Sequence, residues 1–320
     1  MDADMSPEMA LQVLDMLTGG GSMDNINTSL ALRLIPLAQE LDDPDLVERL
    51  LEHASTIAAS DEERGWARFE ALKVMNAEID SYLRLAEDAE SIEDGQALNA
   101  AVHHYVALLY LANQQLDEAR ATAQHALRLR QSLDDKEGLS YGMALLMTVA
   151  KRQHDEHTAI AVGTERLELL IALKDDEGQM EALADLAHCQ ATIGEFGAAR
   201  ELFDRSLEHA SNLGSLSGQL VARWGLADLA EIEQDYENAM LVLSECLHEF
   251  IAADVAAPAP LRQRIKDLTD LQHQPTRAEE TPRTATPIMS HAAVEETLSE
   301  HGARHLLLHL TNTGRKRSHP

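Results

Sequence analysis

Residues 178–203 read GQMEALADLAHCQATIGEFGAARELF. This segment is rich in residues that favour helices and has one clear break at Gly194, so it predicts two helices joined by a tight turn. The segment is one copy of an internal repeat with a period of 40 residues, which is marked by small residues at Ala119, Ala159, Ala199 and Ala239 and at Gly138, Gly178 and Gly218. Because one such unit cannot bury its apolar face alone, the period predicts a stacked solenoid.

Helix-favouring residues dominate the chain from residue 28 to residue 253, without the alternation of a strand. We expect a first helix from Pro7 to Leu17, capped by Ser6, and then a series of helix pairs. The pairs are predicted at 28–41 with 44–59, 61–75 with 78–91, 98–113 with 116–133, 138–153 with 156–173, 178–193 with 196–213, and 218–233 with 236–253. The fold class is therefore all-α.

The motif formed by Leu186-Ala187, Gly194, Ala199 and Phe203 resembles the tetratricopeptide repeat. The resemblance covers residues 95–253 well and residues 28–94 loosely, with a longer period than the family's usual value of about 34 residues. It implies a right-handed superhelical solenoid of antiparallel helix pairs. A stack of HEAT or armadillo type has a compatible period and is the alternative.

Four segments follow from this organisation. Residues 1–27 form an N-terminal helix and a Gly-rich linker, residues 28–94 form degenerate helical repeats, and residues 95–257 form the tetratricopeptide-like repeats. Pro258 and Pro260 are expected to end the array. The remainder, 258–320, would contain a short helix at 261–271, a Pro- and Thr-rich linker, a last helix at 291–310 and a basic tail.

The formal net charge of −29 argues against binding to the phosphates of nucleic acids, which needs dense Lys and Arg. It favours a basic or neutral partner. The N-terminus lacks the pattern of a signal peptide, and the apolar runs are too short to span a membrane, so we expect a cytoplasmic protein. Cys189 and Cys246 are interpreted as small buried residues, because they form neither a disulfide framework nor a metal motif.

In tetratricopeptide arrays, the first helices of successive pairs line a concave groove that binds peptides. The resemblance therefore implies a non-catalytic scaffold or regulatory adaptor, of the kind found in bacterial signalling proteins, with a protein or peptide ligand and no cofactor. By register, the partner-binding positions would be His104, Leu108, Tyr141, Thr148, Lys151, Arg152, Glu181, His188, Trp224, Asp228 and Glu231.

Three of these positions carry two interpretations each. Trp224 is either an interface anchor or a core residue that fills space between helices. Lys151 and Arg152 either bind a carboxylate or phosphate on a partner, or stand at a solvated helix end that favours cations.

The 15 histidines raise an enzymatic alternative, a metal-dependent hydrolase. His301, His305 and His309 share one predicted helix face, and His154 and His157 flank two acidic residues, although packing and a polar turn explain these patterns better. Two further alternatives are a self-associating structural protein and an autoinhibited one. In the second, the basic tail, from Arg304 to Arg317, would dock on the acidic body.

Overall fold

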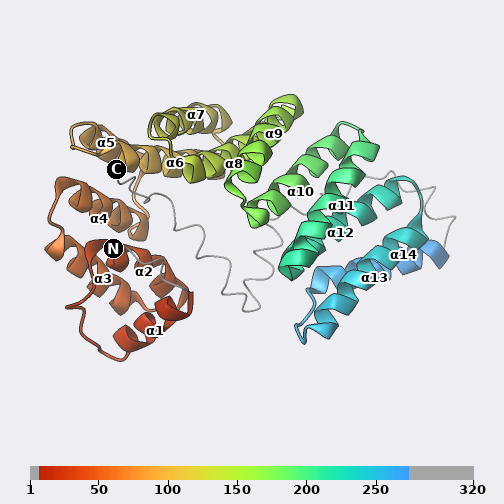
Figure 1. Ribbon diagram of the computed structural model, residues 1–320, viewed down its shortest axis with the longest axis horizontal. Helices are drawn as coiled ribbons and strands as arrows, with labels where there is room; N and C mark the ends of the chain where they lie inside the picture. The colour runs from red at the N-terminus through yellow and green to blue at the C-terminus, as the bar shows by residue number, and fades with distance from the viewer. Residues whose placement is uncertain (1–6, 274–320) are drawn as a thin grey trace. The chain divides into compact units, whose positions relative to one another are not determined.

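The computed structural model describes residues 7–273, and the secondary structure in this range is α-helical (Figure 1). The helices, in chain order, are α1 (Pro7–Thr18), α2 (Thr28–Glu40), α3 (Pro44–Ile57), α4 (Asp61–Val74), α5 (Ile79–Glu90), α6 (Gln96–Ala112), α7 (Leu116–Ser132), α8 (Lys136–Arg152), α9 (Glu156–Leu173), α10 (Asp176–Thr192), α11 (Phe196–Leu213), α12 (Leu216–Ile232), α13 (Tyr236–Ala252) and α14 (Ala259–His273).

The predicted helices of the repeat region are confirmed, and their ends agree with the observed ones to about two residues, which is the usual uncertainty of helix ends. The first helix is confirmed as well. The proposed Ser6 cap, the last helix at 291–310 and the basic tail lie outside the described residues. The division of the chain into four segments stays a prediction.

Each turn in the repeat region contains one residue in the left-handed conformation, which ends the preceding helix. These residues are Gln114, His154, Gly194 and Gln234 within pairs, and Asp134, Lys174, Gly214 and Asp254 between pairs. In every one of these turns, the next amide donates a hydrogen bond to a carbonyl five residues earlier, as Ser215 does to Ala210 at 2.8 Å. The side chain of that next residue often caps the following helix, and Asp175 accepts from the Gly178 amide at 2.9 Å.

The periodic glycines lie where one pair meets the next. A Cβ at Gly178 would come within 2.5 Å of Leu170 Cδ2, and one at Gly218 would come within 3.0 Å of Ala210 Cβ. Leu170 and Ala210 are in the last turn of a second helix, so the glycine lets that turn pack directly on the next first helix. The periodic alanines, Ala119, Ala159, Ala199 and Ala239, are completely buried.

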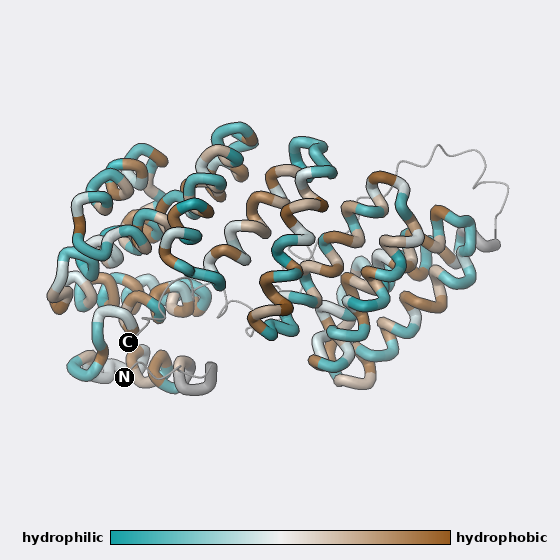
Figure 2. The backbone as a smooth tube through the Cα atoms, turned by 45° about the horizontal axis from the view of Figure 1, so that its top comes forward, coloured by the Kyte–Doolittle hydropathy of each residue, from teal (hydrophilic) through white to brown (hydrophobic). Residues whose placement is uncertain are grey.

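The described helices form two compact units that divide within α8, between Leu145 and Leu146. In the first unit, each helix from α2 to α7 packs against the next one, and α2 contacts α4 while α4 contacts α6. In the second unit, the same holds from α9 to α14, and α10 contacts α12. First helices of successive pairs therefore lie side by side within each unit. Apolar and polar residues alternate along the individual helices, as packed amphipathic helices require (Figure 2).

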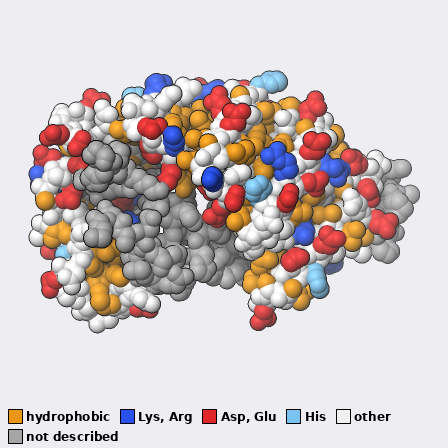
Figure 3. Space-filling view, in the orientation of Figure 1, with side chains coloured by type: hydrophobic (Ala, Val, Ile, Leu, Met, Phe, Trp, Pro, Cys, Tyr) orange, Lys and Arg blue, Asp and Glu red, His pale blue; other side chains and the backbone are white. Residues whose placement is uncertain are grey.

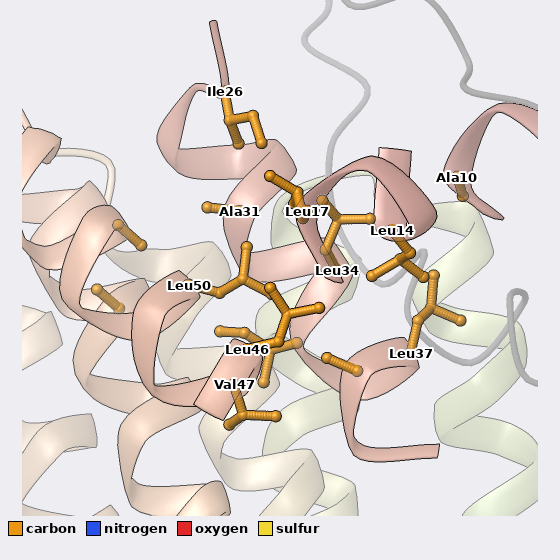
Figure 4. Packing of buried hydrophobic residues seen from close by; sticks show 14 residues of the cluster. Ala10, Leu14, Leu17, Ile26, Ala31, Leu34, Leu37, Leu46, Val47 and Leu50 are labelled. Carbon is orange, nitrogen blue, oxygen red and sulfur yellow. The ribbon is translucent and has the colours of Figure 1, made fainter. Parts of the chain in front are cut away.

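The core of the first unit begins with the N-terminal helix. Leu14 and Leu17 of α1 point toward Leu34 of α2 and toward Leu46 and Leu50 of α3 (Figure 4). All five side chains are buried. The contact explains how α1, which precedes the repeats, is held against the first helix pair.

Helix α14 coincides with the short helix predicted at 261–271, and the end of the repeat array at Pro258 and Pro260 stays a prediction. Helix α14 packs on α13, and Leu261 and Leu268 of α14 are buried in the same core cluster as Leu243 of α13. Pro258 lies just before α14, and Pro260 lies in its first turn. Proline is tolerated there, because the amides of the first turn have no hydrogen-bond partner within the helix.

The turns allow a direct test of left-handed strain. Gly194 has a φ of 86°, and a Cβ there would meet nothing within 4 Å, so Gly194→Ala adds strain and little else. We expect it to lower the free energy of unfolding by about 1 kcal/mol. His154→Gly, at the same position of the preceding repeat, should raise it by a similar amount. Urea denaturation followed by circular dichroism measures the free energy of unfolding of both variants. If both substitutions changed it in the same direction, left-handed strain would not be the cause.

Candidate functional site

The eleven positions predicted to bind a partner all lie on first helices of pairs. His104 and Leu108 are on α6, Tyr141, Thr148, Lys151 and Arg152 are on α8, Glu181 and His188 are on α10, and Trp224, Asp228 and Glu231 are on α12. His104, Leu108 and Tyr141 belong to the first unit and the others belong to the second. Asp and Glu side chains are spread over the face of the molecule that Figure 3 displays, as the net charge leads one to expect.

A cluster of four charged side chains connects α8, α9 and α10. Lys151 Nζ lies 3.2 Å from Asp185 Oδ1, and Arg166 Nη2 lies 3.2 Å from Glu181 Oε2. Arg166 Nη1 is 3.9 Å from the second oxygen of Asp185. The two cations and the two carboxylates thus balance each other. Lys151 and Glu181, predicted to contact a partner, already have partners within the chain.

The charges in this cluster stabilise one another. Burial alone would raise the pKa of Asp185, but Lys151 and Arg166 outweigh it and hold that pKa below its usual value. Burial would lower the pKa of Lys151, but Asp185, together with Cys189 and Glu156, outweighs it and raises that pKa. Both groups are therefore ionised at neutral pH, and they tie α8 to α10.

His188, which follows Asp185 by one helical turn, is buried and neutral. Burial, followed by the charge of Lys151, lowers its pKa to about 3. Its ring packs edge-on against Phe203, with the centroids 4.9 Å apart, and neither ring nitrogen has a hydrogen-bond partner among the described residues. His188 therefore contributes to packing at neutral pH.

A second charged cluster joins α12 to α14. Arg264 Nη2 lies 3.1 Å from Asp228 Oδ1 and is also bonded to Glu231 Oε2. Burial, together with the nearby Glu231, raises the pKa of Asp228 to about 7, although Arg264 opposes the shift. One guanidinium thus serves two carboxylates, and Asp228 is the more deeply buried residue, with only 9% of its surface exposed.

Trp224 is 7% exposed and belongs to the core cluster of α12, α13 and α14, together with Leu243, Phe250 and Leu261. These contacts support the core interpretation of Trp224. Its use as an interface anchor stays a prediction. Among the predicted positions, Thr148 and Arg152 are exposed on α8, and Leu108 is 40% exposed on α6.

Sequence reasoning missed Asp185, Arg166 and Arg264, which make the principal charged contacts. The repeat contains a signal for one of them. Arg166 occupies the position that Ala126, Ser206 and Cys246 occupy in the other repeats, and a large cation among small residues needs a carboxylate nearby. No such signal marks Asp185, because acidic residues are common throughout the chain.

The histidines and cysteines considered as catalytic or metal-binding groups lie in a turn or in the core where the structure describes them. Within residues 7–273, no group of three His, Cys, Asp or Glu side chains could hold a metal ion. The His154 cluster lies in a turn, as interpreted, where Asp155 Oδ1 accepts from the Thr158 amide. His301, His305 and His309 lie outside the described residues. Cys189 and Cys246 are buried free thiols, as predicted, and burial raises the pKa of each to about 12.

In the range from residue 7 to residue 273, the helices are too short or too polar to cross a membrane.

The sequence matches no protein-family model and no curated protein. Solved structures do share its fold. The signal transduction ATPase with numerous domains (STAND) from Pyrococcus horikoshii, which has a tetratricopeptide repeat sensor, matches with a TM-score of 0.58 and 15% identity over 88% of this chain and 45% of that chain. Apo RapI matches with a TM-score of 0.53 and 14% identity over 68% and 83%, respectively.

BtubC from P. vanneervenii matches with a TM-score of 0.52 and 18% identity over 73% of this chain and 93% of that chain. At such identities, these likenesses concern the fold alone. Together with the paired helices, the likeness to the STAND protein shows that the chain has a tetratricopeptide-like repeat fold.

The two carboxylates should respond to pH in opposite ways. The pKa of Asp228 is raised in the folded state, so the folded chain binds the extra proton, and stability falls as the pH rises from about 4 to about 7. Asp228→Asn should therefore stabilise the chain near pH 8 by up to about 4 kcal/mol, and this gain should vanish near pH 4. Thermal unfolding of both proteins across this range checks it. A gain that is independent of pH would contradict the shifted pKa.

For Asp185, the pKa is lowered in the folded state, so its contribution to stability is present above the unfolded-state pKa and is lost as the pH falls. Asp185→Asn should lower the free energy of unfolding at neutral pH by about 2 kcal/mol, because Lys151 and Arg166 lose a shared charged partner. Asp204→Asn removes an exposed carboxylate from α11 and is the matched control. Denaturant titrations at neutral and acid pH measure the difference, and an equal effect of both substitutions would refute the role of the cluster.

Proposed function

We propose that this chain is a non-catalytic scaffold or regulatory adaptor that binds a protein or peptide segment through its first helices. The observation that supports the proposal is the side-by-side packing of first helices within a unit, as between α10 and α12. Such packing presents side chains of successive repeats in one row. A tetratricopeptide repeat is the sensor of the similar STAND protein, which fits a regulatory role.

Helix α8 carries the exposed side chains that suit a partner. Thr148 and Arg152 are four residues apart and therefore share a helix face, and Lys151 on the same side reaches Asp185 of α10. Since Lys151 is already paired, Arg152 is the cation of this surface that can bind a carboxylate or a peptide carbonyl. We define Thr148 and Arg152 as the α8 surface.

The partner that fits the remaining surface is basic or neutral. The net charge of −29 repels acidic chains at long range, and the carboxylates of Glu181 and Asp185 keep about 30% and 27% of their side-chain surface exposed beside the α8 surface. A peptide with mixed polar side chains can bind both Arg152 and these carboxylates.

Catalysis is not part of the proposal, because the titratable groups near this surface do not suit it. The Cys189 thiol, with its pKa raised to about 12 by burial, is not a thiolate at neutral pH. His188, with its pKa lowered to about 3, is too weak a base to abstract a proton efficiently.

Capture of a partner from lysate of the source organism, read by mass spectrometry, tests the proposal. The wild type should retain a protein that the double variant Thr148→Arg, Arg152→Glu does not, because the variant changes the size and the charge of the α8 surface. Trp224 and Lys151 are poor choices for this variant, since truncating a buried Trp costs about 3–5 kcal/mol and Lys151 is paired with Asp185.

The matched control is Arg205→Glu, which makes the same charge reversal as Arg152→Glu at an exposed position of the second helix α11. It should retain the partner. Circular dichroism should give equal helicity for all three proteins. Retention of the same protein by the double variant, or its loss from both variants, would rule out the α8 surface as the binding site.

A further inference from the structure

Arg130 is a cation in a position built for an apolar side chain. It lies in the last turn of α7, and the corresponding residues of the next three repeats are Leu170, Ala210 and Phe250, all buried. Arg130 is buried as well, with only 2% of its surface exposed. Arg130 therefore places a guanidinium where the next three repeats place a leucine, an alanine or a phenylalanine side chain.

Two nitrogens of the Arg130 guanidinium lack hydrogen bonds. Within residues 7–273, Nε and Nη1 have no hydrogen-bond partner, and the Asp135 carboxylate lies 3.9 Å from Nη1, close enough for an ion pair but too far for a hydrogen bond. The other oxygen of Asp135 is engaged with the Gly138 amide at 2.9 Å. His104 Nδ1 of α6 is also buried without a partner, and burial, then Arg130, lowers the pKa of His104 to about 3. Neutral His104 can therefore donate one hydrogen bond.

The first turn of α8 closes this location. A Cβ at Gly138 would overlap Arg130 Nη1 and Asp135 Oδ2, so the guanidinium lies directly against the helix start. Helix N-termini carry a partial positive charge that favours anions. Arg130, His104 and the start of α8 are all within the first unit.

Arg166 provides the comparison within the same chain. It is also a buried arginine of a second helix, 3% exposed, and it is matched by Glu181 at 3.2 Å and by Asp185. A buried guanidinium stays ionised, because its pKa remains far above neutrality even when burial lowers it, as it does for Arg130. A buried charge whose hydrogen bonds are incomplete is unfavourable, and for Arg130 only the Asp135 carboxylate at 3.9 Å compensates it within the described residues.

We propose that Arg130 binds a compact oxyanion, a phosphate or a carboxylate group, in place of the Asp135 carboxylate that caps the start of α8, with His104 as a second donor. The planar guanidinium suits both kinds of anion. Binding requires a local opening of the turn between α7 and α8, because the unpartnered nitrogens are buried. The site is separate from the α8 surface and does not depend on the proposed function.

Titration calorimetry on the full chain, with inorganic phosphate and with succinate at an ionic strength held constant with NaCl, tests this site. We expect one bound anion per chain in the wild type. Arg130→Leu, which introduces the residue of the next repeat, should weaken binding at least about tenfold and should raise the melting temperature without anion. Arg128→Leu, an exposed arginine of the same helix, is the control and should bind like the wild type.

The comparison of phosphate with succinate identifies the class of anion. Absence of binding of either anion by the wild type would overturn the proposal, and so would equal binding by the wild type and Arg130→Leu. If Arg130→Leu does not fold, the Nε–H resonance of Arg130 in the wild type, assigned by its loss in Arg130→Lys, decides. It should shift during the titration, and an unchanged resonance would exclude the site.

Discussion

The contact between the end of one helix pair and the start of the next is the constraint on which the structure depends. Gly178 lies against Leu170, and Gly218 lies against Ala210. A Cβ at Gly178 would clash with Leu170, and a Cβ at Gly218 would be in very tight contact with Ala210. Because each contact joins the last turn of a second helix to the first turn of the next first helix, it determines how closely successive pairs stack. The left-handed residue in each turn, such as Gly194, directs the chain into this packing.

Close stacking has an electrostatic consequence, because it buries charged side chains between helices. Arg166 and Lys151 meet two carboxylates of α10, and every charge has an opposite neighbour. Arg264 meets two carboxylates of α12 by itself and does not offset burial, so the pKa of Asp228 is raised while the pKa of Asp185 is lowered. An ionised aspartate thus stabilises the contact of α8 with α10 at neutral pH, through Asp185, and destabilises the contact of α12 with α14, through Asp228.

The helices and turns were predictable because they depend on neighbours in the sequence. Caps such as Asp175 and breaks such as Gly194 act over a few residues. The charged pairs were not predictable, because Asp228 and its partner Arg264 are 36 positions apart on different helices. The repeat register predicted that Asp228 faces a partner. In the structure, the Asp228 carboxylate accepts from Arg264 of α14.

The sequence by itself determined the helices, their pairing and the positions of closest approach, since a 40-residue period of glycine and alanine records them directly. Only the tertiary structure decided which side chains of the first helices are used internally. Trp224 is in the core and Lys151 is in an ion pair. Arg130 is buried, and two of its nitrogens find no hydrogen-bond partner in the part of the chain that the structure describes. The physical reason is that burial and charge compensation depend on neighbouring helices, which a periodic pattern in one chain does not specify.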